Sequence, residues 1–243
     1  MTSSGTLFLL PTPLSNSDPA QILSAGALQV ARAATYVLAE NARSARAFLK
    51  AAGHPGPIQQ VQIVQIGHDP QPAQARQWLQ PLRDGGEAAL VSECGCPAVA
   101  DPGATVVACA HDMGLRVRPL VGPSSILLAL MASGFNGQRF CFHGYLPQQV
   151  GALADDLRRL DRDAARGETQ IFIETPYRTH RLFLAILEHC NSATRFCVAL
   201  DLGSALETVL TRSIAQWRGI AQSALPDLHR RPAVFLLCSG LAA

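Results

Sequence analysis

The chain has 243 residues, a formal net charge of +2 and only 16% charged residues. A chain of this length buries a core without disulfides or a metal, and its low charge content argues against intrinsic disorder and against a heavily basic nucleic-acid coat. The seven cysteines lack the spacing of a small disulfide-rich domain, so we expect reduced thiols in a cytoplasmic protein. We expect neither a secretion signal nor a membrane span, because the apolar runs are short and interrupted by proline, glycine and serine.

Up to residue 121, short apolar runs alternate with longer helical patterns. The runs predict five strands, at 6–10, 36–39, 61–66, 88–91 and 116–120. The segments between them predict helices at 19–33, 44–51, 72–82 and 104–113. Strands separated by helices need crossover connections, so this half predicts an α/β domain with a mostly parallel five-stranded sheet.

Gly122-Pro123 predicts a hinge, which divides the chain into an N-terminal α/β domain, 1–121, and a C-terminal α/β domain, 122–243. In the second domain the pattern predicts helices at 125–132, 153–166 and 178–190 and strands at 140–142, 170–173 and 195–200. Asp155 and Arg159 stand at the i, i+4 spacing of an ion pair. A run at 207–211 is expected to pair antiparallel and 233–238 to close the sheet, which makes the second sheet mixed.

Familiar catalytic signatures are absent from the sequence. No Gly-x-Gly-x-x-Gly follows the first strand, and no Walker loop, His-Glu-x-x-His or Gly-x-Ser-x-Gly occurs. Cys94-Gly95-Cys96 has no second cysteine pair at zinc spacing, which favours a tight loop of small residues over a metal or redox site. We therefore expect no metal.

Loops rich in proline, glycine and small polar residues follow four predicted strands, at 11–16, 92–103, 122–125 and 174–178. Ligands of open parallel sheets bind at the carboxyl ends of the strands. Small residues let backbone amides and carbonyls approach such a ligand closely. The four loops together predict a small-molecule cleft.

Five segments containing these loops occur in the order of a known family: Gly5–Pro13, Ala89–Gly103, Arg116–Ser125, Arg139–Pro147 and Ile171–Arg178. They resemble the tetrapyrrole methylase superfamily, and the resemblance runs from Gly5 to about Gly240. Within the superfamily they are most similar to the branch that methylates the ribose 2′-oxygen of a cytidine in small-subunit ribosomal RNA.

The resemblance implies two α/β domains, usually in a homodimer, with S-adenosylmethionine bound in a cleft between the domains. Cys94-Gly95-Cys96 matches the turn whose backbone holds the methionine end, and Phe172, Leu200 and Val234 match positions that line the adenine pocket. The complete set of matched cofactor positions is Pro13, Leu14, Cys94, Gly95, Cys96, Val99, Asp101, Ser125, Ile126, Phe172, Leu200 and Val234.

Methyl transfer mainly requires alignment of the nucleophile with the methyl carbon, and the sequence identifies no catalytic base. Candidates for substrate binding are Glu40, Arg43, His143, Glu174 and Arg178. His143 is either a base near neutral pH or a packed residue, and Glu40 and Arg43 either bind substrate or pair with each other. Arg230-Arg231 is typical of a solvated cluster.

The chain departs from the RNA-methylating branch in its substrate-facing motifs. The branch's Glu-Asp-Thr-Arg is Glu40–Arg43, its Asp-Ala-Gly-Thr-Pro is Glu93–Pro97, and its Arg-Glu-Leu-Thr-Lys is Leu200–Ser204, which lacks both basic residues. We also expect the chain to lack the branch's basic C-terminal extension. Because lysine and arginine supply most of the affinity for RNA phosphates, three hypotheses stay open: methylation of ribosomal RNA, methylation of a tetrapyrrole or other small molecule, and a non-catalytic S-adenosylmethionine-binding module.

Overall fold

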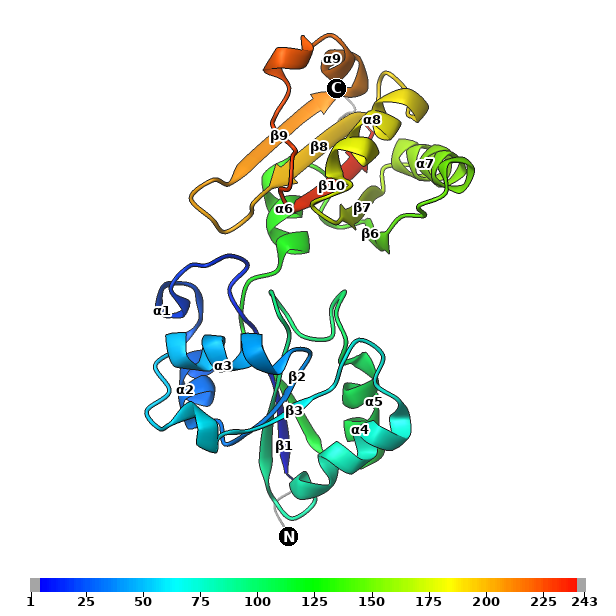
Figure 1. Ribbon diagram of the computed structural model, residues 1–243. Coiled ribbons are helices and arrows are strands. Elements are labelled where there is room, and N and C mark those ends of the chain that lie inside the picture. The colour runs from blue at the N-terminus through cyan, green and yellow to red at the C-terminus, as the bar shows by residue number, and fades with distance from the viewer. Residues whose placement is uncertain (1–4, 240–243) are drawn as a thin grey trace. The chain divides into compact units, whose positions relative to one another are not determined.

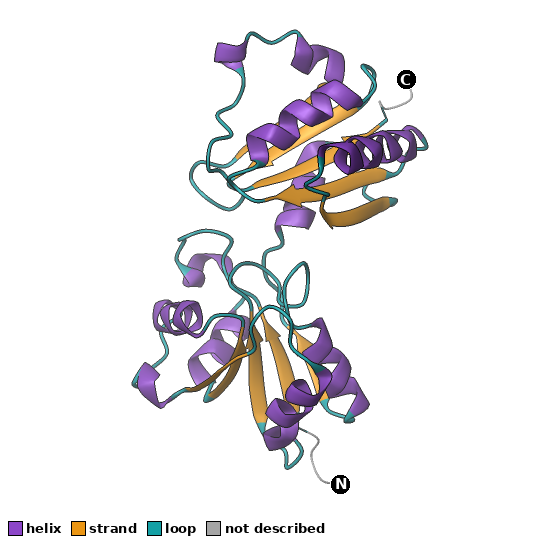
Figure 2. Cartoon of the chain, turned by 45° about the vertical axis from the view of Figure 1, so that its right-hand side comes forward, coloured by secondary structure: helices purple, strands orange, loops and turns teal. Residues whose placement is uncertain are grey.

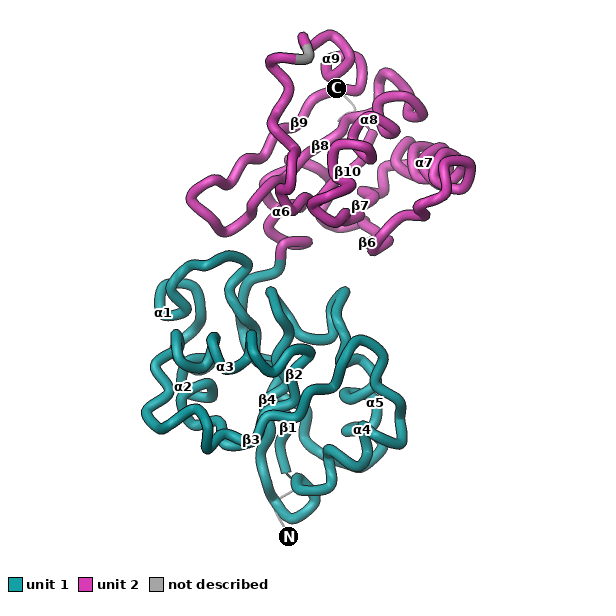
Figure 3. Tube along the Cα trace, viewed as in Figure 1, with its two compact units in different colours: residues 1–124 teal, residues 125–243 magenta. Residues whose placement is uncertain are grey.

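The computed structural model describes residues 5–239 and divides the chain into two compact units, 1–124 and 125–243 (Figure 3). Each unit is built on its own five-stranded sheet. The division falls after Ser124 rather than after residue 121, because Gly122 and Pro123 pack within unit 1. A Cβ atom on Gly122 would lie 2.2 Å from Cγ of Pro11, and Cys96 donates a hydrogen bond to the Pro123 carbonyl.

Unit 1 contains a parallel sheet in the order β3-β2-β4-β1-β5. Its strands are β1 Thr6–Leu10, β2 Tyr36–Ala39, β3 Gln62–Gln65, β4 Glu87–Val91 and β5 Arg116–Pro119. Its helices are α1 Pro19–Ile22, α2 Ala25–Ala33, α3 Ala42–Ala51, α4 Pro72–Leu79 and α5 Ala104–Asp112, with short 3₁₀ turns η1 Ile58–Gln60 and η2 Gln80–Leu82.

Two predicted helices of unit 1 are interrupted. The segment 19–33 forms two helices, because the Ser24 hydroxyl accepts a hydrogen bond from the Ala27 amide at 3.2 Å and starts α2. The segment 72–82 continues beyond Leu79 only as a 3₁₀ turn. Pro81 lies in that turn and has no amide to donate to a further turn of α4.

Helices cover both faces of the unit 1 sheet (Figure 2). On the central strands, Leu10 and Val37 face the core beneath α2 and α3, while Leu38 and Leu90 face the core beneath α4 and α5. Strands buried on both faces are apolar throughout. Because the strands are all parallel, the loops that follow them gather at one end of the sheet (Figure 2), which is the end where open parallel sheets bind ligands.

Unit 2 contains a mixed sheet in the order β6-β7-β10-β8-β9, in which only β6 and β7 are parallel. Its strands are β6 Phe140–Tyr145, β7 Thr169–Glu174, β8 Arg195–Leu200, β9 Thr208–Ser213 and β10 Ala233–Cys238. Its helices are α6 Ser125–Ser133, α7 Val150–Ala165, α8 Thr179–His189, α9 Ile214–Arg218 and the 3₁₀ turn η3 Gln222–Ala224. The two-domain α/β class and both sheet types are as predicted.

Helices α7, α8 and α9 are labelled beside the unit 2 sheet in Figure 1. Five aromatic rings fill the core that these helices share with the sheet. Neighbouring ring centroids lie 5.4–6.1 Å apart among Phe172, Phe183, Phe196, Trp217 and Phe235. Helix α6 packs on the opposite face, against β8, β9 and β10. Both faces of the unit 2 sheet are thus covered by helices.

On the surface of α7, the predicted pair of Asp155 with Arg159 does not form. Arg158 forms an ion pair with Asp155 at 3.1 Å. Arg159 instead forms ion pairs with Asp156 at 3.2 Å and with Asp163 at 3.9 Å. Residues three and four apart are both neighbours on a helix, and here the i, i+3 partners are closer. No helix in the described part of the chain has the length and hydropathy needed to cross a bilayer.

Candidate functional site

In unit 1 the loops after β1 and β4 are joined by backbone hydrogen bonds. The Thr12 amide donates to the Gly95 carbonyl at 2.9 Å, and the Gly95 amide donates back to Thr12 at 3.2 Å. The buried Thr12 hydroxyl also donates to the Ser92 carbonyl at 3.5 Å. Because β1 and β4 are adjacent in the sheet, these loops meet although they are 80 residues apart.

The loop from Ser92 to Gly103 has an unusual backbone. Gly95 has φ of 79° and Gly103 of 132°, values that glycine adopts without a steric cost. Ala98 and Ala100 are also left-handed, at 66° and 61°. Within residues 5–239 the other non-glycine residues with positive φ are Asp201 and Arg230, in strand-end loops of unit 2. Such conformations concentrate at functional sites, which supports both loop groups as candidates.

The two thiols of this loop donate to carbonyls of different neighbouring loops. Cys94 Sγ lies 3.5 Å from the Leu14 carbonyl oxygen, and Cys96 Sγ lies 3.3 Å from that of Pro123. Burial, and then the carboxylates of Asp101 and Glu93, raise the pKa of Cys94, and burial raises the pKa of Cys96. Both thiols stay protonated at neutral pH and hold the loop in place. The described residues contain no group of three or more metal-ligating side chains placed to hold an ion.

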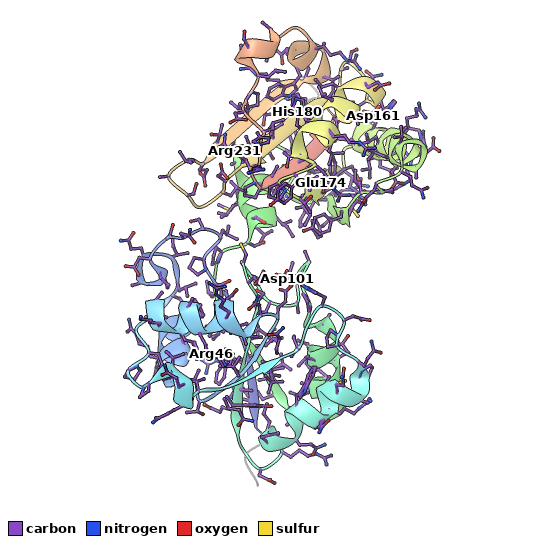
Figure 4. All side chains as sticks on the ribbon, viewed as in Figure 1. Arg46, Asp101, Asp161, Glu174, His180 and Arg231 are labelled. Atoms are coloured by element: carbon purple, nitrogen blue, oxygen red, sulfur yellow. The ribbon has the colours of Figure 1, made fainter. Side chains whose placement is uncertain are left out.

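Three carboxylates gather near this loop: Glu40 after β2, and Glu93 and Asp101 after β4. Asp101 is labelled in Figure 4. Glu93 accepts a hydrogen bond from the Ser44 hydroxyl at 2.8 Å. Burial, followed by the charges of Glu40 and Glu93, raises the pKa of Asp101 to about 6, against the opposing effect of a hydrogen bond from Ser92. Asp101 is therefore ionised at neutral pH, and with the neighbouring carboxylates of Glu40 and Glu93 it makes this end of the unit 1 sheet attractive to a cation.

Glu40 and Arg43 do not pair with each other. Glu40 binds His68 Nδ1 at 2.9 Å, because β2 and β3 are neighbours and their following loops meet. Arg43 is exposed and forms no ion pair with any residue of the described range. The alternative in which Glu40 and Arg43 pair with each other is therefore wrong, and substrate binding by Arg43 stays a prediction.

The candidate charges of unit 2 neutralise each other. Glu174, which ends β7, is bound by Arg178 Nη2 at 2.6 Å and Nε at 2.9 Å, and it also accepts from the Thr175 amide at 2.6 Å. The Glu174 side chain is only 7% exposed. The pair therefore clamps the loop between β7 and α8 rather than presenting a free charge.

His143 is a packed residue of β6. Its Nε2 lies 2.7 Å from Oε1 of the buried Gln170 on the neighbouring strand. Of the two alternatives for His143, this contact favours the packed one, because the Gln170 side chain occupies one ring nitrogen.

The predicted cofactor positions fall into distinct groups. Those of unit 1 come together at the carboxyl ends of β1 and β4: Pro13, Leu14, Cys94, Gly95, Cys96, Val99 and Asp101. Ser125 and the buried Ile126 form the first turn of α6.

The three predicted adenine positions lie on the three central strands of the unit 2 sheet, towards one end of these strands, where Leu200 pairs with Ala233 and Val234 pairs with Ile173. Their side chains do not share one face. Phe172 and Leu200 belong to the aromatic core, whereas Val234 alternates with Phe235 and faces the other side of the sheet.

Arg231, predicted as part of a solvated cluster, instead forms an ion pair with Asp201. It also donates to the carbonyls of Leu206 at 2.8 Å and Asp227 at 3.2 Å. An open cavity of about 390 Å³ is lined there by Ala205, Leu206, Glu207, Thr208, Asp227 and Arg231. No spacing rule links Asp201 to Arg231, so sequence reasoning missed the pair.

Residues 18–217 match the family model of the Tetrapyrrole (Corrin/Porphyrin) Methylases. The chain is 31% identical over 242 residues to ribosomal RNA small subunit methyltransferase I of Xylella fastidiosa (strain Temecula1), with 100% of this chain and 84% of that protein covered. The Pseudomonas aeruginosa protein of the same name is 29% identical over 214 residues, with 88% and 72% covered. Among solved structures, the methyltransferase CobJ has a similar fold, with a TM-score of 0.62 at 16% identity and 98% and 95% covered.

Proposed function

The chain belongs to the tetrapyrrole methylases and is therefore a methyltransferase, and we propose that it transfers the methyl group of S-adenosylmethionine to the ribose 2′-oxygen of a cytidine in small-subunit ribosomal RNA. The observation that carries this proposal is the similarity over the whole chain to relatives named ribosomal RNA small subunit methyltransferase I. The geometry of unit 1 and the basic face of α3 support it independently.

The strand-end loops of unit 1 suit the methionine end of S-adenosylmethionine. That part of the cofactor carries a sulfonium and an ammonium cation, and the carboxylates of Glu40, Glu93 and Asp101 lie beside the loop. Gly95 has no side chain to obstruct a ligand and places its backbone against Thr12. A site of main-chain groups and nearby carboxylates binds such a zwitterionic cation without a charged sequence motif.

The bound cofactor supplies an activated methyl group, so the chain's own task is mainly to align the ribose hydroxyl with it. In the transfer the hydroxyl oxygen bonds to the methyl carbon, the carbon–sulfur bond breaks, S-adenosylhomocysteine leaves, and the hydroxyl proton passes to a base or to water. The raised pKa of Asp101, about 6, leaves this carboxyl ionised at neutral pH beside the proposed methionine site.

A basic face on α3 supports an RNA substrate. Arg43, Arg46 and Lys50 are exposed at i, i+3 and i+7, so they lie along one side of the helix (Figure 4). None of the three forms an ion pair with another described residue. Free cations at this spacing match a phosphate backbone, which offsets the basic residues missing from 200–204.

A small molecule such as a tetrapyrrole is the second candidate substrate. The observation that favours it is the replacement of the branch's basic motif by Leu200–Ser204, in which Asp201 is committed to Arg231. The third alternative is a cofactor-binding module without catalysis.

We further propose a homodimer in the cytoplasm. Leu127 and Met131 are exposed one turn apart on α6 and offer apolar area to a second copy. All seven cysteines are free, as suits a reducing compartment. Light scattering of the purified chain tests the dimer, and a monomer at micromolar concentration would contradict it.

The decisive experiment incubates purified protein and radiolabelled S-adenosylmethionine with small ribosomal subunits from a strain in which the gene for this protein is deleted. We expect label in RNA, at one cytidine when ribose methylation is mapped. Label recovered only in a small-molecule fraction of cell extract would instead support the second candidate. Cofactor binding by calorimetry without transfer to any fraction would leave the non-catalytic module.

A further inference from the structure

We propose that Tyr177 and Arg230 form a platform on which an unpaired base of the substrate RNA stacks. The Tyr177 ring is 82% exposed, and Arg230 Cζ lies 6.0 Å from its centroid. The inference rests on the proposed RNA substrate and assigns to unit 2 a surface that holds it.

Tyr177 is the most exposed large hydrophobic side chain in the described range, at 82% against 56% for Tyr145 and 41% for Phe140. Arg230 has a left-handed φ of 55°. A non-glycine residue keeps this conformation only where the surrounding structure holds it. The exposed Tyr177 ring and the left-handed Arg230 lie beside each other. We therefore look for one set of contacts that holds both residues in place.

The loop that carries Tyr177 is rigid. Glu174 accepts hydrogen bonds from the Thr175 amide at 2.6 Å and from Arg178 Nε at 2.9 Å, and the Arg178 amide donates to the Thr175 carbonyl at 2.9 Å. These hydrogen bonds occupy polar groups of Glu174, Thr175 and Arg178, the residues that flank the turn of Tyr177. The ring is left pointing out of a fixed turn.

The loop that carries Arg230 is fixed to the first one. The Thr179 hydroxyl, which is fully buried, lies 3.1 Å from both the Thr175 and the Arg231 carbonyl oxygens and links the two loops. Arg231 is anchored by Asp201 and by the Leu206 carbonyl. The same network therefore holds Tyr177 and Arg230 in position, and a preorganised surface loses little entropy on binding.

A nucleic-acid base is the ligand that this surface fits. Aromatic rings and guanidinium planes both stack bases, and such stacking is the usual means by which proteins hold unpaired RNA. The other charges here are largely neutralised: Glu174 by Arg178, Asp201 by Arg231, while Glu207 and Asp227 accept backbone amides of Gly203 and His229. Stacking, rather than phosphate attraction, is therefore the expected source of affinity.

The test compares Tyr177→Ala with Tyr177→Phe, which keeps the ring, in the full-length chain. The probe is a single-stranded oligoribonucleotide from the methylated region, with 2-aminopurine beside the target cytidine. We expect Tyr177→Ala to weaken binding by about 10- to 100-fold, the range for one stacked base, and to abolish quenching of the 2-aminopurine. Tyr177→Phe should stay within about twofold and keep the quenching. Cofactor affinity and the unfolding midpoint should be unchanged in both variants.

The dependence of binding on salt gives a second readout. Loss of a stacked base lowers affinity without changing the slope of log K against log salt, whereas loss of a phosphate contact reduces that slope. If Tyr177→Ala binds and quenches as the unmodified chain does, the platform is refuted while the RNA function stands. Reduced self-association of Tyr177→Ala with unchanged RNA binding would refute the platform in favour of a protein interface. If the unmodified chain itself binds no RNA, the proposed function fails and the platform with it.

Discussion

The strand-end loops of the two units use similar side chains in opposite ways. In unit 1, burial and then the carboxylates of Glu40 and Glu93 raise the pKa of Asp101, and none of the three carboxylates forms an ion pair with an arginine of the described range. In unit 2, Glu174 and Asp201 each lie against an arginine, at Arg178 and Arg231. The carboxylates of unit 1 thus have no arginine partner, whereas those of unit 2 form ion pairs that hold the strand-end loops in place.

This difference separates two tasks of a methyltransferase. Unneutralised carboxylates cost stability and are useful only if a cation binds beside them. Partly buried ion pairs give little net stability, but they hold loops in a single geometry. We infer that the edge of unit 1 is built for the cationic donor and that the edge of unit 2 is built to hold an acceptor.

The largest expected effect comes from removing a clamp in unit 2. Arg178→Ala leaves the buried Glu174 carboxylate without its partner, and we expect a loss of about 3 kcal/mol in the free energy of unfolding. Urea titration followed by Trp217 fluorescence, in a Trp78→Phe background, measures it. Arg158→Ala is the control: its pair with Asp155 is exposed at 52% and 81%, so a loss below about 0.5 kcal/mol is expected. Equal losses of unfolding free energy in the two variants would show that the buried pair of Glu174 with Arg178 contributes no more than the exposed pair of Asp155 with Arg158.

The next effect tests whether unit 1 depends on close backbone approach. A Cβ atom on Gly122 would lie 2.2 Å from Pro11 Cγ, so Gly122→Ala must displace the loop after β1, at about 2 kcal/mol. Gly137→Ala is the matched control, because a Cβ there meets nothing within 4 Å. Calorimetric unfolding should show a loss for Gly122→Ala alone. An unchanged unfolding midpoint of Gly122→Ala would mean that Pro11 can move away from the new methyl group without a loss of stability.

The fold was largely predictable because its signals are local. All ten strands were placed within a few residues, since apolar runs between helical patterns identify buried strands. The break at Ser24 was missed because one hydroxyl decided it against a continuous apolar pattern. The short helix α9 was also missed, since it begins directly where β9 ends.

The site was less predictable because its partners are distant in the chain. A pair of Glu40 with the nearby Arg43 was one of two alternatives that the sequence left open, but the neighbouring strands β2 and β3 bring His68 to Glu40 instead. Asp201 and Arg231 are 30 residues apart and meet because β8 and β10 are neighbours. The loops themselves were identified from their proline, glycine and small polar residues at strand ends, and the family resemblance added which of their residues match cofactor positions. An ion pair between two such loops depends on which strands are neighbours and on how they are aligned, and the spacing of residues in the sequence gives neither.

A smaller effect concerns the charge of Asp101. Its pKa in the folded chain is about 6, above the ordinary value of 3.8, so the folded state holds this proton more tightly than the unfolded state does. Stability from this group is therefore complete below about pH 4 and is lost as pH rises through about 6. Asp101→Asn, which mimics the protonated form, should be about 1 kcal/mol more stable than the unmodified chain at pH 8, after allowance for solvent screening. Urea titrations at pH 4 and pH 8 measure this gain, which should vanish at pH 4. The same gain at both values would show that Asp101 carries no unfavourable charge.

The smallest effect tests whether the positive charge of unit 1 also contributes to RNA binding. Arg46 lies exposed in the middle of the basic face of α3 and forms no ion pair with another described residue. If it contacts one phosphate, Arg46→Ala should reduce the slope of log K against log salt by about 0.7 and weaken RNA binding by about two- to threefold. Arg162→Ala on α7 makes the same charge change at an exposed arginine of unit 2, and it should leave the slope unaltered. Equal changes of slope in both variants would mean that RNA binding responds only to the net charge of the protein. The strand-end loops of unit 1 would then bind the methyl donor without help from α3 in binding RNA.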